Sequence, residues 1–514
     1  MLIGLDAGTS VIKAVAFDLS GRQVAAAAVP NRYVTRPDGA AVQDQDATWA
    51  DAADALRALS GKVGGLAARA AALAVTAQGD GTWLVGKDDA PVGEGWIWLD
   101  SRSAPTVRAL RAQGADAARY AATGTGLNCC QQGAQLAHMQ SRLPHLLEGA
   151  ECALHPRDFL FLRLTGLRVS DPSETCFTFG DFRTRTHDEA VIDALGLRPL
   201  RRLLPEIMDG ARDTAPLSAA AAAATGLRAG LPVSLGYVDV ACMLLGGGIF
   251  TGTGAAGCSI IGSTGMHARC IAPGDFTPNP DRTGYVMLLP IEGRAAQLQS
   301  NMAATLNIDR LLDLAADLLA DFGAPVDRPA LLGRLSRWLE AAEPGRILYH
   351  PYISEAGERG PIVEDAARAS FIGLNSGHRF PDLARAAVEG LALAAADCYA
   401  AMGPVPAEIR LSGGAARSDG LRGILGAALG VPVRRCEREE AGAAGAAMTA
   451  AVAIGAYLDM QACIDAWVAP LLTRPEAPDP ALSALYTALK PHYLAARDAL
   501  PPVWRGLAAT RGTP

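Results

Sequence analysis

Short apolar runs separated by turn residues fill the beginning of the chain, a pattern typical of consecutive β-strands. Leu2–Leu5 is apolar and runs into a Gly/Thr/Ser turn, after which alternating positions predict a second strand over Val11–Phe17. A third strand is predicted over Gln23–Val29. A helical pattern from about Asp46 to Leu59 then precedes another strand, Ala71–Thr76. This order of elements indicates an α/β fold.

A comparable unit lies near the middle of the chain. Val233–Gly236 is predicted to be a strand, and Val240–Leu245 begins a helix. The helix should end at Gly246–Gly248, because three consecutive glycines cost a helix roughly 1 kcal/mol each. We expect a domain boundary and a hinge here. Gly252–Gly265 encloses the apolar run Cys258–Ile261 and predicts two more strands joined by a glycine turn, so the two halves show a faint internal duplication.

Helical patterns dominate the second half. They are predicted over Asn307–Phe322, Phe380–Met402 and Ala415–Leu429. Ala441–Leu458 carries no charge over eighteen residues, yet it consists mostly of Ala and Gly, which contribute little to membrane transfer. We therefore expect a buried, closely packed helix there, and not a membrane span.

Composition narrows the possible partners. The chain has 514 residues, too many for one core, so two domains are expected. A formal net charge of −7 and the lack of a Lys/Arg-rich block argue against nucleic acid or an anionic membrane as partner. Ten cysteines include no C-x-x-C pair, and Cys129–Cys130 suits neither zinc nor an ordinary disulfide. Because the apolar start is interrupted at Asp6, we expect no secretion signal and a cytoplasmic location.

Asp6-x-Gly8-Thr9-Ser10-x-x-Lys13 is the first group of residues that suggests chemistry. A Gly/Thr/Ser turn can approach phosphate oxygens with backbone N–H groups and hydroxyls. Asp6 would organise Mg²⁺ nearby, and Lys13 would offset phosphate charge. The alternative is an ordinary hairpin turn with an incidental aspartate.

Asp239 follows a predicted strand and precedes a helix. A carboxylate there can accept the proton of a substrate hydroxyl during phosphoryl transfer. The alternative is a helix N-cap, for which Asp is a favoured residue. The local sequence leaves both interpretations open and by itself favours the cap.

Two further segments are candidates for reading a polyol. Carboxylate, amide and guanidinium groups supply donors and acceptors for neighbouring hydroxyls, while a tryptophan covers C–H surface. The candidates are Gln78, Asp80, Trp98, Asp100 and Arg102. A surface salt bridge beside a core tryptophan is the alternative.

Glycine turns of the second half suggest a nucleotide site. Gly252–Gly257 has the spacing G-x-G-x-x-G, but the β-like run after it does not fit a dinucleotide fingerprint, so a phosphate-contacting turn is favoured. A glycine pair before a helix, near residues 411–417, allows flat approach of a nucleotide. The predicted ATP- and phosphate-binding residues of this half are Gly262, Ser263, Thr264, Gly413, Gly414, Ala415 and Arg417.

Several other chemistries are missing from the sequence. No G-x-x-x-x-G-K-[S/T] occurs, which argues against a P-loop kinase, and no G-x-S-x-G or H-E-x-x-H is present. His267 and His350 are expected to be hydrogen-bonded structural residues.

The order of these motifs resembles the FGGY carbohydrate kinase family across nearly the whole chain, in the stretches Asp6–Lys13, Trp98–Arg102, Asp239, Gly252–Gly265, Gly413–Arg417 and Glu440–Met448. The resemblance implies two ribonuclease-H-like domains of the actin-like ATPase type with a cleft between them, here residues 1–246 and 247–514. It implies transfer of a phosphoryl group from ATP, with Mg²⁺, to an alcohol group. Asp239 matches the catalytic aspartate and, with Asp6, is expected to hold Mg²⁺ through water.

Other blocks match the family in more detail. Thr9 and Ser10 fall in its first phosphate motif, Gly257–Gly265 in its second, and Gly413–Ala415 in its adenosine loop. Gly357–Pro361 matches a further block of the second domain.

Three stretches are similar to the members of this family that act on erythritol: residues 77–86, 123–128 and 351–359. They imply a small polyol as substrate. The segment Cys129-Cys130-Gln131-Gln132 departs from the family, where many relatives place a Lys. Other family substrates, such as xylitol, a ketopentose or glycerol, stay open, as does an actin-like ATP-binding module without catalysis. A homodimer is expected from the habit of the family.

Overall fold

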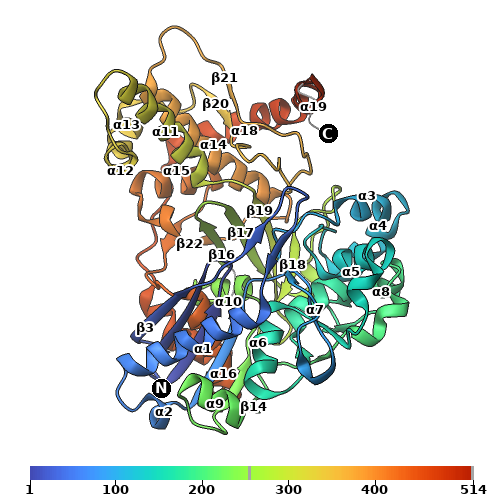
Figure 1. Cartoon of the computed structure of the whole chain (residues 1–514). Helices are drawn as coiled ribbons and strands as arrows, with labels where there is room; N and C mark the ends of the chain where they lie inside the picture. The colour runs from blue at the N-terminus through green and yellow to red at the C-terminus, as the bar shows by residue number, and fades with distance from the viewer. Residues whose placement is uncertain (253–255, 511–514) are drawn as a thin grey trace.

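Two six-stranded β-sheets, one from each half of the chain, organise the fold (Figure 1). The computed structural model describes residues 1–252 and 256–510. Across the first sheet the strands are β14 (Ala215–Pro216), β15 (Pro232–Leu235), β6 (Ala72–Ala77), β1 (Leu2–Ala7), β2 (Val11–Phe17) and β3 (Gln23–Pro30). Across the second they are β18 (Tyr285–Leu288), β19 (Ala295–Asn301), β17 (Gly265–Ile271), β16 (Ala256–Ile261), β22 (Glu408–Ser412) and β23 (Val433–Arg435).

The two sheets share one arrangement of five strands. β1, β2 and β3 form an antiparallel meander, and β6 and β15 extend the sheet in parallel from β1. In the second sheet β16, β17 and β19 form the meander, and β22 and β23 extend it in parallel from β16. The internal duplication predicted from the glycine turns is therefore present in the topology.

Most predicted elements lie where the pattern placed them, with shifts at their ends. β1 continues to Ala7, so Asp6 lies on the strand and faces Lys13 of β2 in register. The helix predicted over Ala415–Leu429 begins only at Asp419, because a short 3₁₀ turn, Gly414–Arg417, comes first and Ser418 caps the helix. The helix predicted to reach Leu458 ends at Ala453.

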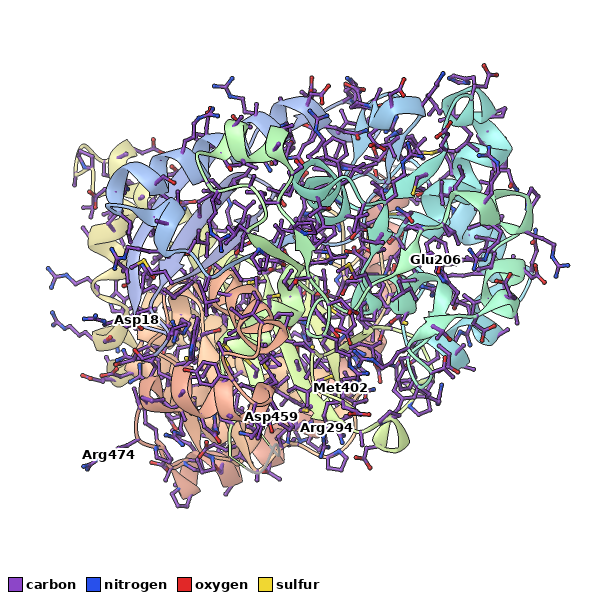
Figure 2. All side chains as sticks on the ribbon, turned by 90° about the horizontal axis from the view of Figure 1, so that it is seen from below. Asp18, Glu206, Arg294, Met402, Asp459 and Arg474 are labelled. Carbon is purple, nitrogen blue, oxygen red and sulfur yellow. The ribbon has the colours of Figure 1, made fainter. Side chains whose placement is uncertain are left out.

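Helices cover both sheets and form a separate lobe on the first half. The first sheet is covered by α1 (Gln45–Lys62), α2 (Leu66–Arg69), α6 (Pro156–Thr165) and α9 (Ala219–Thr225). The lobe contains α3 (Ala104–Ala112), α4 (Ala115–Thr123), α5 (Gln132–Arg142), α7 (Pro172–Phe179) and α8 (Glu189–Ala194). The second half contributes α11 (Thr305–Asp321), α12 (Arg328–Leu332), α13 (Leu335–Ala341), α14 (Phe380–Ala400), α15 (Asp419–Leu429), α17 (Met460–Trp467), α18 (Pro480–Ala499) and α19 (Pro501–Thr510). Seen from below, side chains fill the interior while Arg474 projects from the rim (Figure 2).

Two helices, α10 (Asp239–Gly246) and α16 (Ala441–Ala453), join the halves. Although α16 belongs to the second half of the chain, it packs on β1 and β6 of the first sheet (Figure 1). A Cβ atom placed on Gly445 would lie 2.1 Å from the carbonyl oxygen of Cys242 in α10. Only glycine allows backbones to approach this closely.

The apolar run that raised the question of a membrane span is thus an interior packing helix. Across the described part of the chain, no helix is both long enough and apolar enough to cross a membrane. His267 and His350 are buried and hydrogen-bonded, to Ser259 Oγ at 2.9 Å and to the Tyr493 carbonyl at 3.0 Å, as predicted.

The crossing of α10 and α16 gives a test of stability. We expect Gly445→Ala to destabilise the protein by about 1–3 kcal/mol, because the new methyl group collides with a backbone carbonyl that has no room to move. Gly423→Ala in α15 is the control: nothing lies within 4 Å of its Cβ position, so better helix propensity should stabilise by about 0.5–1 kcal/mol. Thermal unfolding measures both; equal shifts of the two variants would contradict the close crossing.

Candidate active site

The two predicted phosphate turns occupy equivalent places in the two sheets. Gly8–Ser10 joins β1 to β2, and Gly262–Thr264 joins β16 to β17. Ser10, Ser263 and Thr264 are exposed. Their hydroxyls and the surrounding backbone are therefore accessible to a ligand.

The predicted nucleotide loop adjoins the second turn. Gly413 has a φ of 88°, and a Cβ on it would lie 2.6 Å from the carbonyl oxygen of Ile261, the last residue of β16. Gly413 and Gly414 are exposed, Ala415 is buried, and Arg417 points to solvent. The structure thus brings the loop Gly413–Arg417 beside Gly262–Thr264. Residues 253–255 of the G-x-G-x-x-G stretch lie outside the described residues. β16 begins at Ala256, within the stretch, and includes the predicted run Cys258–Ile261.

Asp239 is the first residue of α10, and the N-cap position belongs to Val238. Its Oδ1 accepts a hydrogen bond from the backbone N–H of Val240 at 2.7 Å. Burial, reinforced by the negative charge of Asp6, raises the pKa of Asp239 to about 7. The pKa of Asp6 is itself raised to about 6, chiefly by burial, with Lys13 opposing and Glu440 adding to the rise. The two carboxylates therefore act on each other although they lie far apart in sequence.

Lys13 does not point freely into this site. Its ammonium group donates to Glu440 at 2.8 Å, across two segments more than 400 residues apart. Glu440 immediately precedes α16, and a Cβ on Gly442 would lie 2.3 Å from Asp6 Oδ2, so the start of α16 abuts Asp6. The sequence analysis missed Glu440 as a partner, since nothing local connects it to Lys13.

Three predicted residues form one hydrogen-bonded chain. Trp98 Nε1 donates to Thr9 Oγ1 at 2.8 Å, and Thr9 Oγ1 donates to Gln78 Oε1 at 2.7 Å. Gln78 Nε2 then donates to Gln43 Oε1 at 2.6 Å. The first phosphate turn and the predicted polyol-reading segments are therefore parts of one site.

Asp80 lies in the same region in an unusual conformation. Its φ of 60° is left-handed, and its side chain is buried. Oδ2 accepts from Cys130 Sγ at 3.2 Å and from the Tyr285 hydroxyl at 3.3 Å, whereas Oδ1 has no partner among the described residues. Burial raises the pKa of Asp80, opposed by these two donors and by His155. A Cβ on the preceding Gly79 would lie 4.0 Å from Asp239 Oδ1, so the two aspartates are neighbours.

Asp100 and Arg102 bind each other. Their charged groups are 2.6 Å apart, and the guanidinium lies 3.5 Å above the ring of Trp96. Asp100 is fully buried and also accepts the backbone N–H of Ala41 at 2.9 Å. The arrangement is an ion pair beside a core tryptophan, one of the two interpretations that the sequence left open.

A buried group of charges beneath Asp80 and Asp239 was missed by sequence reasoning. Arg157 lies 2.8 Å from Asp158, 2.6 Å from Asp171 and 3.2 Å from Glu174, and all four side chains are fully buried. His155 is 3.0 Å from Asp158. One signal was available: two adjacent charged residues, Arg157 and Asp158, lie in the first turn of an apolar helix, which favours paired burial.

No group of three or more His, Cys, Asp or Glu side chains in residues 1–252 and 256–510 is arranged to hold a metal ion. Mg²⁺ does not require such a group, because it usually keeps several waters and takes one or two carboxylates together with substrate phosphates. Asp6 and Asp239 fit that pattern: both are partly buried acids whose raised pKa values a nearby cation would lower.

Comparison with known proteins identifies the class to which this fold and these paired turns belong. The FGGY family of carbohydrate kinases matches the chain with its N-terminal domain over residues 1–246 and its C-terminal domain over residues 285–454. The chain belongs to this family, and the resemblance inferred from the motifs is confirmed. The finer division at residues 246 and 247 stays a prediction.

Individual kinases of the family differ in their similarity to this chain. The chain is 60% identical over 509 residues to the erythritol kinase of Brucella abortus (strain 2308), covering 99% of this chain and 98% of that enzyme. It is 29% identical over 432 residues to the xylulose kinase of Escherichia coli (strain K12), covering 83% and 84% of the two chains.

Solved structures support the fold. The xylulose kinase of Rhodospirillum rubrum superposes with a TM-score of 0.86 at 26% identity, covering 98% of this chain and 99% of that one. The glycerol kinase of Plasmodium falciparum with ADP gives 0.82 at 15% identity, covering 96% and 97%. The predicted class of two ribonuclease-H-like, actin-like domains is confirmed.

The raised pKa of Asp239 predicts a pH-dependent change in stability. The folded protein holds this proton more tightly than the unfolded chain, in which Asp239 has its ordinary pKa of 3.8. Stability contributed by the protonated acid is therefore lost as the pH rises from that value to about 7. Asp239→Asn should be more stable than the parent at pH 8, by on the order of a few kcal/mol, and equal to it near pH 3.5.

Thermal unfolding at both pH values measures the difference. Asp465→Asn, on the exposed side of α17, is the control and should stay within about 0.5 kcal/mol of the parent throughout. An Asp239→Asn variant less stable than the parent at pH 8 would show that Asp239 is not a strained buried acid.

Proposed function

We propose that the protein transfers the γ-phosphoryl group of ATP to a terminal hydroxyl of erythritol, giving erythritol phosphate. The observation that carries the proposal is the 60% identity to an erythritol kinase over 99% of the chain. The other relatives named above, at 29% identity or less, act on different acceptors or lie too far away to decide the substrate.

Asp239 is proposed as the catalytic base. A general base works best when its pKa lies near the working pH, and burial raises the pKa of Asp239 to about 7. Its carboxylate lies beside Asp80, where an acceptor hydroxyl would be held. Asp239 would orient that hydroxyl and take its proton as the oxygen attacks the γ-phosphorus.

The polyol is proposed to bind Asp80, Gln78 and Trp98. Asp80 Oδ1 is buried without a partner among the described residues, so a substrate hydroxyl can donate to it. Trp98, held by Thr9, offers an apolar face to the carbon chain. Asp100 and Arg102 are the remaining predicted polyol residues. Because they form an ion pair with each other and Arg102 lies over Trp96, they would hold the Trp96–Trp98 segment in place beside the polyol.

ATP is proposed to bind between the two turns. Thr9 and Ser10 from the first half and Gly262, Ser263 and Thr264 from the second would donate to phosphate oxygens, with Gly413, Gly414, Ala415 and Arg417 along the adenosine. Asp6 and Asp239 would hold Mg²⁺ through water, and the ion would neutralise charge on the phosphates. Lys13 would stabilise the same phosphates, either with its ion pair to Glu440 intact or after that ion pair opens.

Because the two turns lie on different sheets, closure about Gly246–Gly248 would assemble the site only when both substrates are present. The homodimer and the cytoplasmic location stay predictions.

The acceptor preference tests the proposal directly. ADP release measured across erythritol, xylitol, glycerol and ketopentoses should show the highest kcat/KM with erythritol, by at least about tenfold. A clear preference for a five-carbon acceptor would overturn erythritol. No stimulation by any acceptor would favour a nucleotide-binding module without catalysis.

Removing the base should stop chemistry and leave binding intact. Asp239→Asn keeps the size of the side chain, so folding and ATP affinity should persist while kcat falls by about 10²–10⁴-fold. Single-turnover kinetics and calorimetric ATP binding measure the two effects. Turnover near that of the parent would remove Asp239 from this role.

A further inference from the structure

A buried charge cluster lies behind Asp80 and Asp239 and has no role in the mechanism above. It consists of His155, Arg157, Asp158, Asp171 and Glu174. Three carboxylates share one guanidinium and one imidazole there, without access to water. Burying such groups is costly, and their mutual attraction offsets the cost only where the geometry is good and further hydrogen bonds satisfy the remaining atoms. The contacts of the cluster with the backbone of the active site indicate its role.

Glu174 holds the backbone of Asp80. Its Oε1 accepts a hydrogen bond from the backbone N–H of Asp80, and its Oε2 lies 3.2 Å from Arg157 Nη1. Asp80 has the left-handed φ of 60° that a non-glycine residue adopts only when its surroundings fix it. The space is confined, since a Cβ on Gly79 would lie 3.4 Å from Glu174 Oε1.

The same cluster reaches the residue before Asp239. Asp171 accepts a hydrogen bond from the hydroxyl of Ser173, and Ser173 Oγ accepts one from the backbone N–H of Val238 at 3.0 Å. Asp171 lies 2.6 Å from Arg157. One guanidinium thus anchors two carboxylates, one behind Asp80 and one behind the start of α10.

We infer that Glu174 is a positioning residue of the kinase, which fixes the left-handed conformation of Asp80 and so aims the Asp80 carboxylate at the acceptor polyol. Glu174 touches neither the polyol nor ATP; it acts through the Asp80 N–H. Arg157 holds Glu174 in turn, and Asp171 with Ser173 fixes the neighbouring strand end. The inference rests on the proposed function, because it concerns the polyol that Asp80 binds.

Three substitutions separate positioning from packing. Glu174→Ala removes the acceptor of the Asp80 N–H and should raise the KM for the polyol by at least about tenfold while the KM for ATP stays within about twofold. Glu174→Asp keeps a carboxyl group near Arg157 but withdraws the oxygen from Asp80, and should raise the polyol KM at least about fivefold. Glu174→Gln keeps an acceptor oxygen in place, and its polyol KM should stay within about threefold of the parent.

Glu389→Ala is the matched control. Glu389 is also a buried glutamate, 2.7 Å from Arg385, and it accepts the backbone N–H of Gly345 at 3.0 Å, but it lies on α14 in the second half. It should lose stability as Glu174→Ala does and keep both KM values.

The outcomes distinguish the inference from the proposed function. Activity of the parent with erythritol is measured first, and its absence overturns both. With an active parent, an unchanged polyol KM in Glu174→Asp overturns the inference alone, even where Glu174→Ala does not fold. Equal rises in both KM values, or the same rise in Glu389→Ala, would also overturn it, since a loss of packing alone has those effects.

Discussion

The close crossing of α10 and α16 is the constraint on which the rest of this structure depends. Glycine at the contact lets the two backbones approach, with Gly445 against Cys242 and Gly246 against Ala441. Gly4 of β1 meets Ala443 in the same way, so α16 is also pressed onto the first sheet. A helix from the second half of the chain is therefore packed on the sheet of the first half.

That crossing also determines where the charges meet. α16 begins just after Glu440, and its start abuts Asp6 on β1. α10 begins with Asp239 and runs antiparallel to α16, so its last residue, Gly246, meets Ala441. Burial raises the pKa values of Asp6 and Asp239, and the negative charge of Asp6 adds to the rise at Asp239. Such a site would suit the proposed ligands, a phosphate chain with its bound Mg²⁺. The stability lost in burying acids is the usual cost of a site prepared for chemistry.

A second layer of charge supports the first. Burial raises the pKa of Glu174 to about 8 against the pull of His155 and Arg157, whereas at Asp158 the same two cations outweigh burial and lower the pKa to about 2. Two neighbouring carboxylates thus differ in pKa because they contact the cations differently. Such a cluster is rigid, since each group is held by several others, and rigidity is what the left-handed Asp80 requires.

The sequence by itself determined the strands, the turns and the candidate residues, because these depend on local periodicity and on glycine. β2 and the end of α10 at Gly246 lie where the pattern placed them, and the glycine turns mark the two halves. Only the tertiary structure decided which residues meet. Lys13 pairs with Glu440, and Glu174 holds Asp80, across separations that no local pattern encodes. Asp239 shows both parts: its sequence allowed a helix cap or a base, and burial beside Asp6 and Asp80 gave it the pKa of a base.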